Sequence, residues 1–304
     1  MGDASYLKLY REGILEGRFR EALKLLDKCR ICPRECSANR NKRETGFCKT
    51  GRWSKVASFS PHFGEERPLV GKYGSGTIFF SSCNLLCSFC QNYDISHLNK
   101  GSEVLPKELA SIMIRLQDMG CHNINFVTPS HVIPQILEAL FIAVQMGLRV
   151  PLVYNTGAYD KVESLKLLDG IFDIYMPDFK FWDSQWAETF CSAADYPEKA
   201  ASAIREMHRQ VGDLIIDRAG LAVRGLLVRH LVMPEDASGT RNIMRFLAEE
   251  ISTETYLNVM DQYSPLYRAD EDPRINRRIK RAEYERALRW AGETGLKRLD
   301  QRRR

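Results

Sequence analysis

From Thr77 to Cys90 the chain reads TIFFSSCNLLCSFC, a short apolar run followed directly by three closely spaced cysteines. The residues of the run are β-branched, aromatic or small, and a turn with three glycines (Gly71, Gly74 and Gly76) precedes them. An apolar run of this length after a turn is typical of a buried strand. The cysteines are therefore expected on the loop that follows this strand.

The loop carries Cys83, Cys87 and Cys90 in a Cys-x3-Cys-x2-Cys spacing, with Phe89 before the third cysteine. Three thiolates can bind three irons of a [4Fe–4S] cluster, because such clusters are held by cysteine, and the fourth iron is then open to another ligand. Structural thiols or a zinc site are the alternatives, although zinc in a structural site normally takes four protein ligands. The spacing resembles the signature of radical SAM enzymes, in which the open iron binds S-adenosylmethionine.

The composition is that of an ordinary globular protein. The chain has 304 residues, of which 44% are hydrophobic and 27% charged, enough for one large domain with an appendage. It contains no apolar run of about 18 residues, so we expect no membrane span. The first residues lack the apolar region of a signal peptide. Nine cysteines without an export signal indicate reduced thiols, and we expect a cytoplasmic protein.

The formal net charge of +5 arises from the end of the chain, where basic residues outnumber acidic ones from Glu271 onward. We expect residues 266–304 to form a basic C-terminal helix and tail, which ends at Arg302, Arg303 and Arg304. A basic patch for nucleic acid or an acidic partner is the alternative, but no RNA-binding signature supports it. We therefore expect neither nucleic acid nor a membrane among the partners.

Residues 1–70 are expected to form an N-terminal helical and cysteine-rich extension. The apolar residues of the first part have helical spacing, which predicts two short helices that break near Gly17. A second set of four thiols follows within twenty residues, at Cys29, Cys32, Cys36 and Cys48. Four ligands match a closed site, either structural zinc or a saturated [4Fe–4S] cluster, and metal-free thiols are the alternative. His62, Glu65 and Glu66 are expected on a loop after this set, where they bind a substrate, tune a cluster or face solvent.

From residue 77 onward, six apolar runs alternate with helical stretches. We predict strands at 77–82, 123–127, 150–155, 173–177, 225–232 and 255–260, and helices at 106–119, 133–146, 161–168, 200–211 and 240–250. Four glycines stand where these helices should end, at Gly120, Gly147, Gly170 and Gly212. Continuous apolar strands alternating with helices indicate a parallel sheet covered by helices, which right-handed crossovers curl. We therefore predict an α/β fold, a partial (β/α)6 TIM-like barrel over residues 71–265.

Polar residues follow the predicted strands. In a parallel barrel the carboxyl ends of the strands meet at one mouth, where the chemistry collects. After the cysteines, the strand ends carry Thr128 and Ser130, Asn155 and Thr156, Asp178 and Lys180, and Arg229. A structural barrel does not need these charges, since buried charges are costly unless paired. The alternative is that Asp178 and Lys180 pair only with each other and that Thr128 caps a helix.

Beyond the cysteine signature, the chain from Cys29 to Tyr263 resembles the pyruvate formate-lyase-activating enzyme family, and within it an uncharacterised branch of activating-enzyme homologues. The matching segments include 29–48, 62–66, 74–80, 90–92, 123–129, 153–157, 173–180 and 229–232. The resemblance implies that Cys83, Cys87 and Cys90 bind the catalytic cluster. It further implies a cofactor site formed by Phe89, Thr128, Ser130, Asn155, Thr156, Asp178, Lys180 and Arg229.

The same resemblance implies a radical SAM oxidoreductase mechanism. The reduced cluster passes an electron to the sulfonium of S-adenosylmethionine, and the 5′-deoxyadenosyl radical formed takes a hydrogen atom from the substrate. By analogy the substrate is a glycine Cα–H of a partner polypeptide, as in activation of a glycyl radical enzyme, and the electron donor is of the flavodoxin or ferredoxin type. The alternatives are another peptide, an RNA or a small molecule as substrate, and a non-catalytic iron–sulfur or zinc protein for electron transfer or assembly.

Overall fold

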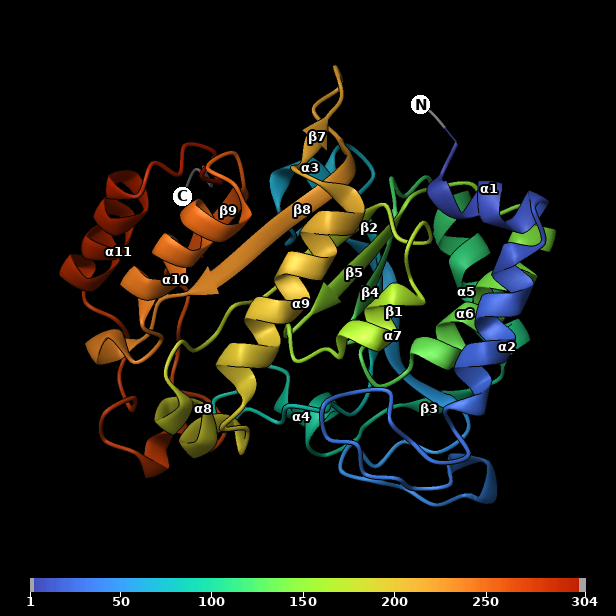
Figure 1. The fold of residues 1–304 in the computed structure, drawn as a ribbon, viewed down its shortest axis with the longest axis horizontal. Coiled ribbons are helices and arrows are strands. Elements are labelled where there is room, and N and C mark those ends of the chain that lie inside the picture. The colour runs from blue at the N-terminus through green and yellow to red at the C-terminus, as the bar shows by residue number, and fades with distance from the viewer. Residues whose placement is uncertain (1–2, 301–304) are drawn as a thin grey trace.

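The computed structural model describes residues 3–300, and a nine-stranded sheet forms the centre of this part of the chain (Figure 1). Six strands lie parallel in the order in which they occur along the chain. They are β2 (Ser75–Phe80), β4 (Ile124–Val127), β5 (Leu152–Thr156), β6 (Ile174–Pro177), β8 (Ala222–Leu231) and β9 (Tyr256–Met260). The predicted order of six parallel strands is confirmed, and the fold is a partial (β/α)6 barrel. The basic run Arg302–Arg304 lies outside the described residues.

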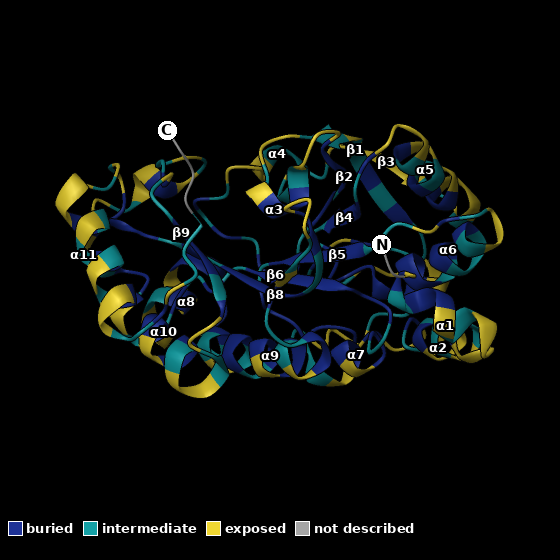
Figure 2. Ribbon diagram, turned by 90° about the horizontal axis from the view of Figure 1, so that it is seen from above, coloured by how far each residue is buried: buried dark blue, intermediate teal, exposed yellow. Residues whose placement is uncertain are grey.

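Helices cover the outer face of the sheet, with their exposed sides turned away from it (Figure 2). The predicted ones are α5 (Pro106–Asp118), α6 (Ile133–Gln145), α7 (Val162–Lys166), α9 (Tyr196–Val211) and α10 (Thr240–Phe246), the last continued by a π-helical turn, Leu247–Ile251. Gly120, Gly147, Gly170 and Gly212 follow four of these helices with positive φ, as predicted. Glycine adopts this backbone conformation without the steric cost that a Cβ would add.

The parallel strands separate an outer core beneath the helices from an inner core inside the curved sheet. Val153 of β5 belongs to the inner core, whereas its neighbour Tyr154 belongs to the outer one. Leu69 of α3 (Arg67–Val70) fills the inner core between the strands. Because side chains alternate along a strand, the next inward positions towards the carboxyl ends are Asn155 of β5 and Arg229 of β8. The pleat therefore places these polar residues at the mouth.

Two strands at the sheet edge were not predicted. β1 (Ser54–His62) runs antiparallel to β2, and β3 (Ser102–Val104) runs antiparallel to β1. The prediction that His62 lies on a loop is therefore wrong, since it is the last residue of β1 and pairs with Ser75. The sequence pattern did not predict β1 because most of the strand is only half buried, and Lys55 and Pro61 interrupt its apolar pattern. The strand nevertheless joins the barrel sheet and brings the following loop to the mouth.

The first two helices are α1 (Ser5–Arg11) and α2 (Ile14–Lys24), and they break at Gly13, with φ of 73°, rather than at the predicted Gly17. Gly17 lies inside α2 with space around its Cα hydrogens, so nothing requires a break there. Phe19 packs against Phe141 of α6 at 5.1 Å between ring centroids, which attaches the pair to the barrel.

The remaining elements are short or terminal. They are η1 (Arg40–Lys42), α4 (Tyr93–Ser96), α8 (Ser184–Cys191), β7 (Ile215–Ile216), η2 (Pro234–Asp236), η4 (Ala269–Glu271) and α11 (Arg281–Glu293). The last is the helix predicted within the basic C-terminal segment. Among residues 3–300, no helix has both the length and the apolar character needed to cross a membrane.

Candidate active site

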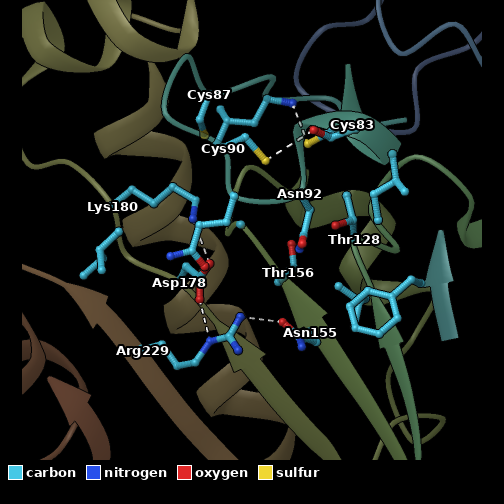
Figure 3. A pocket seen from close by; sticks show the side chains of 18 of the residues that line it. Cys83, Cys87, Cys90, Asn92, Thr128, Asn155, Thr156, Asp178, Lys180 and Arg229 are labelled. Carbon is cyan, nitrogen blue, oxygen red and sulfur yellow. Dashed lines mark hydrogen bonds and ion pairs between the residues drawn. The ribbon is translucent and has the colours of Figure 1, made fainter. Parts of the chain in front are cut away.

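A cavity of about 420 Å³ opens at the carboxyl ends of the parallel strands. Residues from β2, β4, β5, β6, β8 and β9 or the loops after them line it, together with the loop between β1 and α3. Cys83, Cys87 and Cys90 all lie in its wall, above the charged residues of the strand ends (Figure 3). The strand-end residues that were predicted to share one mouth are thus brought together, except Ser130.

The cysteine loop holds its sulfur atoms towards the cavity by local hydrogen bonds. The Leu85 amide donates to Cys83 Sγ at 3.3 Å, and the Ser96 hydroxyl of α4 donates to Cys90 Sγ at 3.2 Å. Donors of this kind stabilise a thiolate more than a thiol, since the charged sulfur is the stronger acceptor. These hydrogen bonds therefore favour thiolates at Cys83 and Cys90.

Burial and neighbouring thiols favour the protonated form of the three cysteines. Burial and the neighbouring Cys87 raise the pKa of Cys83 to about 12, and the same causes raise the pKa of Cys90. A hydrogen bond with the Cys191 thiol, whose Sγ lies 3.4 Å from Cys87 Sγ, together with burial raises the pKa of Cys87 well above its usual range. Metal binding must consequently displace protons from these cysteines, so the site binds metal better as pH rises.

The three cysteines fit a cluster better than a single ion. Within residues 3–300, no three His, Cys, Asp or Glu side chains converge on a point that would hold one metal ion. The cysteines of a [4Fe–4S] cluster bind different irons, whereas those of a structural zinc site bind one ion and normally number four. Three thiols line the cavity, while Cys191, which contacts Cys87, does not, and three lining thiols match a cluster with one open iron.

A network of buried charges forms the opposite side of the cavity (Figure 3). Asp178 accepts hydrogen bonds from Lys180 Nζ at 2.7 Å and from Arg229 Nε at 2.6 Å. Arg229 also donates to Asn155 Oδ1 at 2.7 Å, and its Nη1 lies 3.5 Å from the Glu65 carboxylate. Asp178 and Lys180 do pair with each other, but both also line the cavity.

These ion pairs fix the charges of the network. Burial opposes ionisation of Asp178, but Arg229 and Lys180 outweigh it and hold its pKa below the ordinary value. Burial likewise opposes the charge of Lys180, but Asp178 and then Cys87 raise its pKa. The network thus offers the carboxylate of Asp178, the ammonium of Lys180 and the guanidinium of Arg229, all charged at neutral pH and held in place by each other.

Thr128 adopts a strained backbone conformation at the end of β4. Its φ is 61°, in the left-handed region that β-branched residues rarely enter, and its amide donates to the carbonyl of Asn155 at 2.9 Å. Strain of this size persists where the surrounding structure enforces it, frequently at functional sites. Thr128 lines the cavity. The helix that follows, α6, begins after Val132 and has no side-chain cap, which removes that alternative.

Behind the cavity wall, the buried carboxylate of Asp160 accepts hydrogen bonds from hydroxyl groups. The Thr156 hydroxyl, which lines the cavity, donates to Asp160 Oδ2 at 2.6 Å, and the Tyr154 hydroxyl donates to Asp160 Oδ1 at 2.8 Å. Ser130, predicted to contact the cofactor, lies in this network 2.9 Å from the Thr156 hydroxyl and does not line the cavity. Burial raises the pKa of Asp160. Only its place four residues after Thr156 could have pointed to Asp160.

Some of the remaining cysteine, aromatic and acidic residues line the cavity, and others do not. Phe89 lines the cavity, with its ring 5.8 Å from Phe181. His62, Glu65 and Glu66, for which the sequence left the role open, line the same cavity. Cys191, which was not among the predicted site residues, is a buried thiol that α8 brings to Cys87. None of the four cysteines between Cys29 and Cys48 lines the cavity.

Comparison with known proteins adds one relative and a fold. No protein-family model matches the chain. It is 32% identical over 302 residues to an uncharacterized protein of Methanocaldococcus jannaschii, MJ0674, with 97% of this chain and 83% of that protein covered. Among solved structures, it resembles a radical SAM methyltransferase from Sphaerobacter thermophilus (TM-score 0.50, 14% identity, 73% of this chain). It also resembles HydG, a maturase of the [FeFe]-hydrogenase (TM-score 0.51, 14% identity, 73% of this chain). The chain spans 64% and 49% of the lengths of those two proteins.

Proposed function

Because the chain belongs to the family of the archaeal protein MJ0674 and has the fold of radical SAM proteins, we propose that it is a radical SAM enzyme. The observation that carries the proposal is the set of three cysteines, Cys83, Cys87 and Cys90, on the wall of a cavity at the carboxyl ends of the strands. A set of three leaves one iron of a [4Fe–4S] cluster free for a ligand in that cavity.

When bound, the cluster would supply the electron that splits S-adenosylmethionine into methionine and a 5′-deoxyadenosyl radical, which takes a hydrogen atom from the substrate. The protein positions the cofactor, tunes it and excludes water. The loop donors at Cys83 and Cys90 stabilise the thiolates that hold the irons. Phe89, buried among aromatic rings beside the cavity, gives an apolar face against which an adenine can pack.

The charged network would bind the polar groups of S-adenosylmethionine. Lys180 and Arg229 can donate to its carboxylate and ribose oxygens, while Asp178 supplies the negative charge that a cationic ligand needs nearby. Asn155 and Thr156 add an amide and a hydroxyl on the same wall. Since ion pairs already fix these side chains, little conformational entropy is lost when the ligand binds.

For the substrate we propose a glycine residue of a partner polypeptide, so that the protein activates a glycyl radical enzyme, with a flavodoxin- or ferredoxin-type electron donor. The support is the resemblance of the strand-end segments to pyruvate formate-lyase-activating enzymes. The cavity also presents amide side chains, Gln91, Asn92 and Gln262, that can hydrogen-bond to a peptide backbone. Another peptide, an RNA or a small molecule remains the alternative substrate.

The decisive experiment is reductive cleavage of S-adenosylmethionine by the anaerobically purified protein with dithionite. We expect 5′-deoxyadenosine to be released by the wild type and by Cys121→Ala, which removes a buried thiol outside the cavity. Cys87→Ala should abolish release, and Cys32→Ala should spare it. A protein with full iron and sulfide content that releases no 5′-deoxyadenosine would overturn the proposal and leave a non-catalytic iron–sulfur protein.

A further inference from the structure

Arg40 is buried in the cysteine-rich extension without a carboxylate partner. Only 1% of its surface is exposed, which makes it one of the largest fully buried side chains. Its Nε donates to the Gly51 carbonyl at 2.9 Å and its Nη1 to the His131 carbonyl at 2.8 Å. Nη2 has no hydrogen-bond partner, and Arg40 forms no ion pair with any carboxylate within residues 3–300.

A buried guanidinium in this state is expensive unless a negative charge lies near it. A group near it that can carry negative charge is Cys29, whose Sγ is 3.9 Å from Arg40 Nη1. A neutral thiol would leave the arginine uncompensated, whereas a thiolate compensates it. The burial of Arg40 against Cys29 therefore fits a site in which Cys29 carries negative charge, as a metal-bound thiolate does.

The other three cysteines of the extension lie near Cys29, although the four side chains do not converge on one point. Cys29 exchanges backbone hydrogen bonds with residues 37 and 38, directly after Cys36. Gly46, in the turn that leads to Cys48, lies against Cys36 so closely that a Cβ on it would come within 2.1 Å of Cys36 Sγ. Cys32 is buried, and it lies near enough to Cys48 and Cys29 that, after burial, these thiols help to raise its pKa.

We propose that Cys29, Cys32, Cys36 and Cys48 hold a metal centre of net negative charge and that Arg40 is its buried counter-ion. Four thiolates outweigh the charge of Zn²⁺, and four thiolates around a [4Fe–4S] core likewise leave a negative centre. The bound group is therefore a metal held by four thiolates, either Zn²⁺ or a [4Fe–4S] cluster. Metal binding here is independent of the radical chemistry proposed for the cavity.

The side chain of Arg34 connects the extension to the catalytic loop. Arg34, between Cys32 and Cys36, donates to the carbonyl of Asn84 at 2.9 Å and to the carbonyl of Cys191 at 2.9 Å. Asn84 directly follows Cys83, and Cys191 lies beside Cys87. In Figure 1 residues 29–48, drawn in blue, lie at the lower edge of the molecule, as do α4 and α8. The cysteine-rich extension therefore contacts the loop that carries Cys83, Cys87 and Cys90.

The test measures iron, sulfide and zinc per chain in anaerobically purified protein. A variant with Cys83, Cys87 and Cys90 all changed to alanine should retain one metal centre, and Cys32→Ala combined with Cys48→Ala should lose it. Zinc without sulfide identifies the zinc site, whereas iron with sulfide identifies the cluster. Loss of all metal from the first variant would overturn the proposal, even if the second variant fails to fold. Release of 5′-deoxyadenosine is a separate readout, so failure of the proposed function does not affect this result.

Arg40→Met tests the counter-ion directly. Removal of a residue that supports metal ligands typically costs 10–100-fold in metal affinity, so we expect a loss of roughly that size in competition with a chelator. Arg52→Met is the matched control, because Arg52 lies in the same segment but pairs with Glu138 at 2.8 Å. Equal metal affinity in the two variants would refute the role of Arg40.

Discussion

Replacement of Asp178 by asparagine tests whether the charged network at the mouth is as tightly coupled as its geometry indicates. The substitution keeps the size of the side chain but removes the charge that Lys180 and Arg229 share. About 16% of the Asp178 side chain is exposed, and 17% of each cation, so solvent compensates little of the loss. Breaking a buried ion pair by removing one partner typically costs about 3–5 kcal/mol.

The structure places the expected loss at the lower end of that range. Arg229 keeps its hydrogen bond to Asn155 and stays 3.5 Å from Glu65, whereas the Asp178 carboxylate is the ion-pair partner seen for Lys180. We therefore expect the free energy of unfolding to fall by about 3 kcal/mol. At roughly 2–4 °C per kcal/mol, Tm falls by roughly 6–12 °C.

Thermal unfolding at pH 7, followed by circular dichroism under anaerobic conditions, measures this effect. The control is Asp169→Asn, because Asp169 pairs with Arg209 at 2.7 Å on the surface, where a salt bridge contributes about 0–1 kcal/mol. Because the pKa of Asp178 is held below its ordinary value, the wild type should lose its advantage over Asp178→Asn as pH falls through that pKa. Tm values that agree within about 1 °C for both variants at pH 7 would refute the coupling argument.

Three further substitutions probe the same region. Thr128→Gly should relieve left-handed backbone strain of about 1–2 kcal/mol, at a backbone-entropy cost of about 0.5–1 kcal/mol. Denaturant titration should therefore find a small gain in stability. A clear loss would contradict the strain argument. Burial raises the pKa of Asp160, so its contribution to stability is full at acid pH and is lost as pH rises through that pKa. Relative to the wild type, Asp160→Asn should therefore gain stability as pH rises above about 4. A difference in denaturation that stays constant with pH would be the opposite result. Cys191→Ala removes the thiol that can donate to an iron-bound Cys87, so the cluster should form but with a lower reduction potential in a potentiometric titration. An unchanged potential would mean that Cys191 does not act on the cluster.

The barrel could be predicted from the sequence because its strands are buried on both faces. Runs such as the one that includes Val153 and Tyr154 are continuously apolar, and a glycine with positive φ follows most of the predicted helices. β1 could not be predicted in the same way, since an edge strand that is half exposed has neither signal. The contact of Cys191 with Cys87 spans 104 residues of sequence and depends on how α8 packs, so no local pattern contains it.

The site also shows why its charged residues are tied to the cysteines. Lys180 interacts with two anionic positions, the carboxylate of Asp178 and the sulfur of Cys87 once that thiol is ionised. Asp178 holds Lys180 by a short hydrogen bond, so the ammonium is already oriented before any metal is bound. When Cys87 becomes a thiolate, the same cation lies close enough to stabilise it, and the cost of displacing its proton falls. The network at the strand ends therefore favours a metal-bound state of the cysteine loop even though burial alone favours the protonated thiols.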